Sequence, residues 1–406
     1  MTNTHSSRLL SLDVLRGITI AGMILVNNPG SWGTLYAPLG HAEWHGLTPT
    51  DLVFPFFMFI MGISTYISLK KFNFAWSKDT FLKIMKRVVV IFLIGVGIAW
   101  FSLTLRTYNR LATEELGFFA RLFEAATNFE RLRILGVMQR LALTYGITAI
   151  VAILVKHKYI PYIIGATLFG YFVLLVVGNG FELSEYNILS IVDRAVLTTN
   201  HMWSGNRFLD PEGLLSTIPA AVHVMIGFMC GKIIVNTKDN FVRIQQLFIV
   251  GAIMTFAGLL LSYACPINKT IWSPTFVLTT CGMAATLLAL LIWIIDVKGH
   301  KRWSVFFESF GINPLFMYVF AAVLTILFGN IRFTIDGEFF SIIRIIHVKF
   351  LREMIFEPIF TSRLFGENFL VEHGLYFISF VYALLFVGLN WIVANILYKK
   401  QIYIKI

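Results

Sequence analysis

Charge is scarce in this sequence, and cysteine is scarcer still. Only 14% of the 406 residues are charged, whereas 57% are hydrophobic, and the mean hydropathy is +0.76. Typical soluble domains carry about 25% charged residues, so this composition excludes an ordinary soluble globular protein. The three cysteines, Cys230, Cys265 and Cys281, have neither paired nor metal-ligand spacing. We therefore expect no disulfide framework and no metal site.

Apolar segments long enough to cross a bilayer, about 20 residues each, recur along the chain. They predict an all-α, polytopic membrane helical bundle of about ten transmembrane helices, forming one integral-membrane domain over residues 1–406. The expected spans are 9–28, 50–69, 83–105, 132–155, 159–178, 214–235, 244–264, 273–296, 304–329 and 374–398. Asp13 and Arg16 interrupt the first apolar segment, and no clear cleavage site follows. We expect that segment to be a retained helix, not a signal peptide.

The net charge of +11 is unevenly distributed over the short loops. Most lysines and arginines fall on one set of faces, and most acidic residues fall on the other. Since basic residues stay on the cytoplasmic side, we expect both termini to be cytoplasmic. Loops at about 29–49, 106–131, 179–213 and 330–373 would then face outward. We attribute the charge to this orientation and expect the lipid bilayer, not nucleic acid, as the partner.

His41 lies in the first outward loop, which contains no lysine or arginine. A loop histidine can serve as a general base or form a transient acyl-imidazole, although most such residues are simply solvated. His45 follows four residues later, but no third ligand with sensible spacing accompanies the pair. A zinc site is therefore not predicted.

Two asparagines and one aspartate flank this loop. Asn27 and Asn28 end the first span, where an amide could hold an acyl carbonyl or orient His41; simple helix termination before Pro29 is equally consistent. Asp51 follows Thr48 by three residues, which predicts a capping box at the second span. A second role for Asp51, toward His41, stays open.

Three charged residues lie inside apolar segments, where charge requires a partner or a function. Asp13 and Arg16 are three residues apart and share a helix face, so they can form a structural ion pair. Arg16 could instead clamp a phosphate. Arg140 lies eight residues into the predicted fourth span, about 12 Å from its outer end. It is expected to face the bundle interior or a wet cavity. Asn313-Pro314 in the ninth span predicts a kink.

A series of motifs runs in order along nearly the whole chain. The most specific is His41-Ala-Glu-Trp44-His-Gly46-Leu47-Thr48, continuing from Asp51 to Gly62. The others are Asp13-Val-Leu-Arg16-Gly17, Val26-Asn27, Gly136-Val-Met-Gln139-Arg140-Leu, Phe208-Leu-Asp210-Pro-Glu212-Gly213, Ile267-Asn268-Lys-Thr-Ile-Trp272-Ser273 and Asp296-Val-Lys298-Gly299. Together they resemble the heparan-α-glucosaminide N-acetyltransferase family of transmembrane acyltransferases.

The resemblance implies acetyl transfer from cytosolic acetyl-CoA, without a metal, to the amine of a glucosamine-type sugar on the outer, periplasmic side. The family's active-site histidine falls on His41 and its accompanying asparagine on Asn27, and we group Asp51 with them as catalytic residues. The residues that we assign to the acetyl-CoA site are Arg16, Arg140, Asp13 and Asn28. We interpret the chain as a bacterial, multi-pass protein of the cell (inner) membrane, with a homodimer as a further expectation.

Two other functions fit parts of the sequence. A sugar or small-anion transporter would use Asp13, Arg16 and Arg140 to line a pathway, without acyl transfer. A scaffold that binds glycan without turnover would explain the outward loops but would leave the buried charges without a role. The large N-terminal luminal region of the lysosomal enzyme has no counterpart here, so its specificity for heparan does not carry over. The end of the ninth span, 319–327, also departs from the family pattern.

Overall fold

Helices make up nearly all of the chain, as its apolar segments require. The computed structural model describes residues 9–203, 205, 208–335, 337–361 and 368–404. Arg8 and Lys405, which contribute to the charge asymmetry, lie outside the described residues. The α-helices are α1 (Leu10–Asn27), α2 (Pro49–Lys70), α3 (Lys78–Arg110), α4 (Phe118–Thr127), α5 (Val137–Leu154), α6 (Ile160–Val177), α7 (Ile188–Leu197), α8 (Thr217–Asn236), α9 (Asn240–Leu261), α10 (Pro274–Leu291), α11 (Val305–Ile312), α12 (Pro314–Asn330), α13 (Ile342–Arg344), α14 (Glu357–Phe360) and α15 (Leu375–Lys399).

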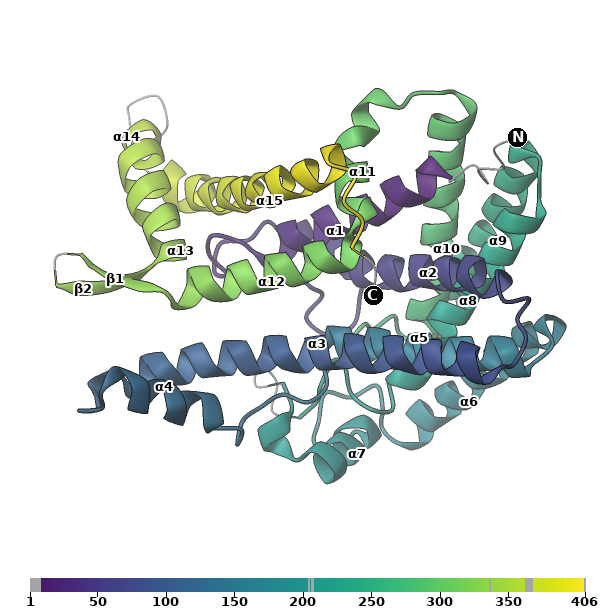
Figure 1. Cartoon of the computed structure of the whole chain (residues 1–406), viewed down its shortest axis with the longest axis horizontal. Coiled ribbons are helices and arrows are strands. Elements are labelled where there is room, and N and C mark those ends of the chain that lie inside the picture. The colour runs from purple at the N-terminus through teal and green to yellow at the C-terminus, as the bar shows by residue number, and fades with distance from the viewer. Residues whose placement is uncertain (1–8, 204, 206–207, 336, 362–367, 405–406) are drawn as a thin grey trace.

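Shorter helical turns complete several of these elements. The π-helical segments are Ile292–Val297, Ile345–Phe356 and Leu370–Gly374. The 3₁₀ turns are Ala37–Leu39, Leu111–Thr113, His157–Tyr159, Thr199–His201 and Arg302–Ser304. Figure 1 shows α1, α2 and α12 between α15 at the top and α3, with α6 and α7 below α3.

The predicted number of spans is confirmed. Within the described residues, nine helices are long and apolar enough to cross a membrane, and the number rises to ten if the bent pair α11–α12 is one span. The all-α class is confirmed with them. Each of the ten predicted segments overlaps one of these helices or the bent pair.

Two predicted boundaries differ from the structure. The third span, expected at 83–105, extends over all 33 residues of α3, because the charged residues at both ends continue the helix beyond its apolar centre. The fourth, expected from residue 132, begins at Val137. Residues before it form a loop in which Arg133 is held by carboxylates. Arg140 therefore lies in the first turn of α5, about 4.5 Å along the axis, and the expected depth of about 12 Å was wrong.

The ninth span is broken at Asn313. Helices α11 and α12 meet there at 77°, so the predicted kink is confirmed. The amide of Asn313 explains how the break is held: its Nδ2 donates to the carbonyl of Ile402 at 2.8 Å, and its Oδ1 accepts from the backbone N–H of Ile404 at 2.8 Å. The chain segment after α15 is thus bonded to the side chain at the break.

The segment after α12 contains the only strands among the described residues, and they were not predicted. Strands β1 (Arg332–Ile335) and β2 (Glu338–Ser341) form an antiparallel hairpin in which Arg332 pairs with Ser341. Gly337, directly before β2, has a positive φ of 81°, which glycine adopts at little steric cost. Residues 342–360, within the predicted outward loop at 330–373, are helical, through α13, the π-helical segment Ile345–Phe356 and α14.

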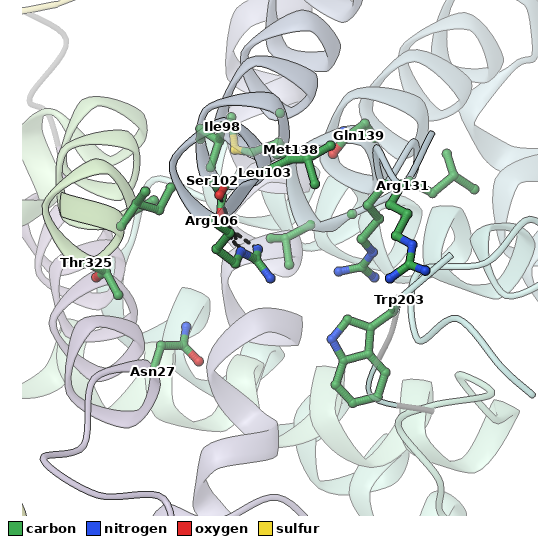
Figure 2. A pocket seen from close by; sticks show the side chains of 18 of the residues that line it. Asn27, Ile98, Ser102, Leu103, Arg106, Arg131, Met138, Gln139, Trp203 and Thr325 are labelled. Atoms are coloured by element: carbon green, nitrogen blue, oxygen red, sulfur yellow. Dashed lines mark hydrogen bonds between the residues drawn. The ribbon is translucent and has the colours of Figure 1, made fainter. Parts of the chain in front are cut away.

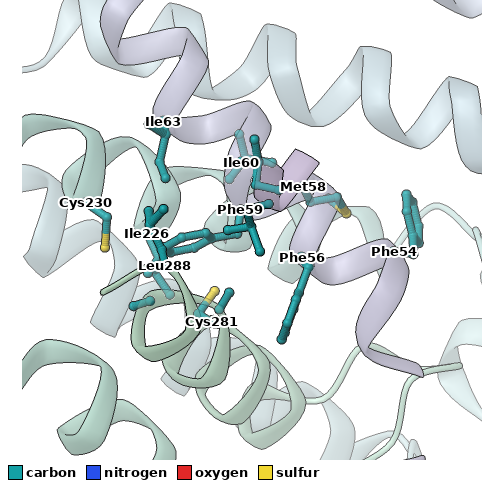
Figure 3. Close-up of a cluster of buried hydrophobic side chains, with 14 of the residues drawn as sticks. Phe54, Phe56, Met58, Phe59, Ile60, Ile63, Ile226, Cys230, Cys281 and Leu288 are labelled. Carbon is teal, nitrogen blue, oxygen red and sulfur yellow. The ribbon is translucent and has the colours of Figure 1, made fainter. Parts of the chain in front are cut away.

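The core places the helices that carry the predicted site residues in close contact. Gly17 on α1 and Gly311 on α11 allow the two backbones to touch: a Cβ at Gly17 would lie 1.7 Å from the carbonyl oxygen of Phe307. Small residues permit such approaches between membrane helices. A second group of buried apolar side chains, from α2, α8 and α10, includes Phe59, Ile226 and Leu288 (Figure 3).

Candidate active site

The turn that begins α2 joins two of the predicted catalytic residues. Asp51 is 1% exposed, and its Oδ2 accepts hydrogen bonds from the backbone N–H groups of Thr48 and Ala42, both at 3.1 Å, and from the Thr48 hydroxyl at 3.0 Å. The predicted capping box is therefore confirmed. Its other oxygen, Oδ1, lies 2.7 Å from Nδ1 of His41. One carboxylate thus caps the helix and contacts the loop histidine.

This contact determines how His41 can react. A carboxylate oxygen accepts hydrogen bonds, so Nδ1 of His41 carries the proton toward Asp51 and Nε2 keeps its lone pair. The side chain of His41 is 48% exposed, so a ligand can reach the ring. The pair has the arrangement of a base that a buried carboxylate orients.

Lys269 is a third member of this group, and the sequence reasoning did not identify it. Its Nζ lies 3.3 Å from Oδ1 of Asp51 and 3.1 Å from Nδ1 of His41. Burial lowers the pKa of Lys269, while the charges of Asp51 and Glu212 oppose that shift and Arg140 adds to it. Lys269 belongs to the motif Ile267–Ser273, and no spacing rule connects that motif with His41.

The loop between α9 and α10 holds Lys269 in place. Asn268 forms the inner frame of this loop: its backbone N–H donates to Oγ of Ser273 at 3.0 Å, and its Oδ1 accepts from the N–H of Ile271 at 3.1 Å. The backbone N–H of Gly46 donates to the carbonyl of Ile267 at 2.8 Å. The His41 loop and the Lys269 loop are thus joined directly through their backbones.

Asp13 and Arg16 form the ion pair expected from their spacing. Nη1 of Arg16 lies 2.8 Å from Oδ1 of Asp13 and 3.3 Å from the carbonyl of Gly311, while Nη2 donates to Oγ of Ser64 at 2.9 Å. These contacts join α1 to α2 and α11. Assignment of both residues to acetyl-CoA binding stays a prediction, and most of the donors of Arg16 already have protein partners.

Arg140 is enclosed by protein. It is 1% exposed, its Nη2 donates to the carbonyl of Gly213 at 3.3 Å and to the hydroxyl of Ser216, and its guanidinium carbon lies 4.9 Å from the ring centre of Trp272. Such contacts with a carbonyl, a hydroxyl and an aromatic face hold a buried guanidinium. The expectation that Arg140 faces the protein interior is met.

Arg133, close to Arg140 in the chain, belongs to an acidic cluster. Its Nη2 lies 2.6 Å from Oδ1 of Asp210 and 2.5 Å from Oε2 of Glu212. Burial alone would lower the pKa of Arg133, but the two carboxylates outweigh it and raise that pKa. The charge of Arg133 is therefore compensated within the protein.

The two asparagines at the end of α1 have different surroundings. Asn28 is buried; its Nδ2 donates to the carbonyl of Ile24 at 2.8 Å and its Oδ1 accepts from Oγ1 of Thr325 at 2.5 Å. Asn28 thus links α1 to α12. Asn27 is exposed and lines a large pocket. Among the described residues, Asn27 forms no hydrogen bond with His41, and His41 does not line that pocket.

The pocket has a volume of about 1070 Å³ and lies between the ends of α1, α3, α5 and α12 (Figure 2). Its polar lining includes Asn27, Arg106, Arg110, Arg131, Arg133 and Gln139. No aspartate or glutamate is among the described residues that line it. Arg133 belongs both to the pocket lining and to the acidic cluster. Glu212 of that cluster also favours the charged form of Lys269, because its negative charge raises the pKa of the amine. No group of three or more His, Cys, Asp or Glu residues in the described part of the chain could hold a metal ion.

Comparisons with known proteins found one family model and two curated relatives. Residues 8–118, which include His41 and Asp51, match a family model described as a domain of unknown function, DUF5009. The chain is 28% identical over 367 residues to the human heparan-alpha-glucosaminide N-acetyltransferase, covering 77% of this chain and 52% of the relative. The mouse protein of the same name is 27% identical over 378 residues, covering 79% and 54%.

The chain therefore spans about half the length of the curated relatives that it matches. The similarity covers most of this chain, and both relatives carry the same name. This membrane protein is a distant homologue of the heparan-alpha-glucosaminide N-acetyltransferases.

Proposed function

We propose that this protein is a transmembrane acetyltransferase that moves the acetyl group of acetyl-CoA to the amine of a glucosamine-type sugar. The observation that carries the proposal is the 2.7 Å contact between His41 and the buried carboxylate of Asp51. It leaves Nε2 of a half-exposed histidine free to accept a proton. The distant relatives, which are named as N-acetyltransferases, supply the reaction class.

A thioester is already activated toward attack by an amine. The protein therefore has to position the two substrates and to transfer a proton. As the sugar amine attacks the thioester carbonyl, Nε2 of His41 takes the proton that the nitrogen loses. When the C–S bond breaks, the imidazolium returns that proton to the thiolate, giving an amide and free CoA. General-base assistance of this kind contributes about 10²- to 10⁴-fold. Asp51 stabilises the intervening imidazolium through Nδ1.

Asn27 takes part in the same reaction through its place in the pocket wall. An amide N–H that donates to the developing oxyanion contributes roughly 3–4 kcal/mol. The exposed position of Asn27 leaves its donor available to a ligand in the pocket. Since its side chain does not bond to His41, we assign it to the acyl oxygen and not to orientation of the histidine.

The proposed sidedness rests on charge distribution. Basic loops favour the cytoplasmic side, which would place the His41 loop on the outer face of the cell membrane and the termini inside. Acetyl-CoA from the cytosol would then have to reach the His41 end of the bundle. Cysteines introduced singly at Glu43 and Lys71, labelled in intact cells with a membrane-impermeant reagent, test this: only the Glu43 position should react.

The decisive experiment uses purified protein with acetyl-CoA and glucosamine. We expect release of free CoA together with N-acetylglucosamine, and loss of at least 10²-fold in rate for His41→Ala. His45→Ala is the matched control, because it removes a neighbouring loop histidine that lacks the Asp51 contact. Full transfer by the His41 variant would disprove the catalytic role.

The break between α11 and α12 favours one second candidate, since transporters often use discontinuous helices at their binding sites. A transporter would accumulate labelled sugar in vesicles without acetyl-CoA and would release no CoA. Only one such bent pair occurs among the described residues, whereas inverted-repeat transporters have corresponding breaks in both halves. Acetyl transfer is therefore our first proposal.

A further inference from the structure

We propose that the pocket beside Asn27 binds the oxyanion of a ligand, a phosphate or sulfate group, through Arg106, Arg110 and Arg131. This inference deepens the proposed function, because the ligand is then one of the two substrates of the transfer. At about 1070 Å³, the pocket is at the upper end of the range for small-molecule sites. It has room for far more than one acetyl group and one sugar amine.

The first argument is uncompensated charge. Arg106 and Arg110 are four residues apart on α3, a spacing at which like charges destabilise a helix. Arg131 approaches the same pocket from the loop before α5. In the described part of the chain, none of the three forms an ion pair, and no acidic side chain lines the pocket. An anion in the pocket would relieve this repulsion.

Arg133 provides an internal comparison. It lines the same pocket, yet Asp210 and Glu212 already neutralise it at 2.6 and 2.5 Å. Within one pocket, Arg133 thus has carboxylate partners, whereas Arg106, Arg110 and Arg131 form no ion pair with any described residue. A planar guanidinium with several free donors is the usual partner of a phosphate or sulfate.

The second argument is orientation. Nε and Nη2 of Arg106 donate to Oγ of Ser102 at 3.2 and 2.6 Å, which fixes the guanidinium and leaves Nη1 for a ligand. Figure 2 shows Arg106 and Arg131 directed toward one part of the pocket, with Trp203 beside them and Asn27 across from them. An anion between the arginines would therefore leave the rest of its molecule directed toward the indole ring and the amide.

The arginines first assigned to acetyl-CoA are less suited to this task. Arg140 is 1% exposed, and Arg16 is bonded to Asp13, Gly311 and Ser64. Arg16 also lies eleven residues before Asn27, about 16 Å along α1. The open cationic site is thus at the Asn27 end of that helix.

Two substrates could bring an oxyanion to this site. The donor carries a diphosphate and a 3′-phosphate, and an acidic acceptor would carry a sulfate or phosphate on its sugar ring. Either anion would make the same contact with a guanidinium. Substrates that lack the anion distinguish the donor from the acceptor as its source. Acetyl-pantetheine replaces acetyl-CoA as the donor, and glucosamine replaces glucosamine 6-sulfate or 6-phosphate as the acceptor.

The test compares a triple variant, Arg106→Gln, Arg110→Gln and Arg131→Gln, with Arg121→Gln. Arg121 stacks on Tyr108 at 3.7 Å and does not line the pocket, so it controls for a local loss of charge. We expect the triple variant to raise the KM of the anion-bearing substrate by at least about tenfold. The KM of its anion-free counterpart and the kcat should stay within about twofold. Selective loss with acetyl-CoA identifies the donor, and selective loss with the sulfated or phosphorylated sugar identifies the acceptor.

Equilibrium binding separates this inference from the proposed function. Titration of the wild-type protein with CoA, glucosamine 6-sulfate and glucosamine 6-phosphate should reveal an anion-dependent Kd for at least one, weakened about tenfold in the triple variant. Such binding without acetyl transfer would support the pocket and reject the reaction. Kd and KM values of the triple variant that match those of Arg121→Gln would overturn the inference. It would also be overturned if none of these ligands bound to the wild type. Neither result would affect the test of His41.

Discussion

Nζ of Lys269 lies 3.1 Å from Nδ1 of His41, although 228 residues separate them in the chain. Both approach Oδ1 of Asp51, at 3.3 and 2.7 Å. The carboxylate thus lies between a cation and an imidazole and influences both. The buried carboxylate is thus held by two side chains from different loops, and the first two predictions concern these contacts.

Asp51→Asn should slow acetyl transfer by about 10²-fold or more, because an amide does not stabilise the imidazolium that forms during proton transfer. Affinity for acetyl-CoA, measured by titration, should change little. Thr48→Ala is the control: it loses a capping contact, worth about 1 kcal/mol, but keeps the contact between Asp51 and His41. If the Thr48 variant lost as much activity as the Asp51 variant, helix capping alone would explain the effect.

Lys269→Met should destabilise the protein, because it leaves the carboxylate of Asp51, which is 1% exposed, without the cation 3.3 Å from its Oδ1. Removing one partner of a buried ion pair costs about 3 kcal/mol. Lys269→Arg keeps the charge and should keep the Tm close to that of the wild type. Equal Tm values for the Met and Arg variants, measured by thermal unfolding in one detergent, would show that Asp51 does not depend on Lys269.

Stability should fall as pH rises from about 4 to 6 because of Asp193. Burial raises the pKa of Asp193 to about 6, from an ordinary value of 3.8. The folded state therefore binds a proton more tightly than the unfolded state, and it loses that advantage as pH passes through the folded value. The change in the free energy of unfolding is about 3 kcal/mol. The Tm of the wild type should therefore fall between pH 4 and pH 6, whereas the Tm of Asp193→Asn should stay level. Parallel plots of Tm against pH for the two proteins would contradict the prediction.

Gly17→Ala should destabilise the bundle by about 2 kcal/mol, since the added methyl group would overlap the backbone of α11, 1.7 Å from the carbonyl oxygen of Phe307. Gly97→Ala on α3 is the matched control, because its Cβ meets no atom within 4 Å, and it should be neutral or stabilising. Thermal unfolding in one detergent compares them. Equal Tm values for the two variants would show that α1 and α11 can separate without cost.

The sequence predicted the bundle well because the bilayer imposes a length and a composition on each span. It also predicted local relationships: the ion pair of Asp13 with Arg16, and the capping box at Thr48. Contacts between distant loops could not be predicted in the same way. Lys269 and the pocket arginines come from segments whose separation along the chain carries no periodicity, and only the packing of helices brings them together. For Asn27 and His41, the family resemblance suggested one site, but among the described residues the two side chains form no hydrogen bond, and His41 does not line the pocket beside Asn27.

The hydrogen bonds of Asn313 have a practical consequence for work with this protein. α1, near the start of the chain, packs on α11 at Gly311, and the segment Ile402–Ile404 bonds to the amide at the break. Elements close to the two ends of the sequence therefore both contact the break between α11 and α12. An affinity tag or fluorophore attached after Ile404 would lie next to these hydrogen bonds, so its effect on stability has to be measured before it is used as a label.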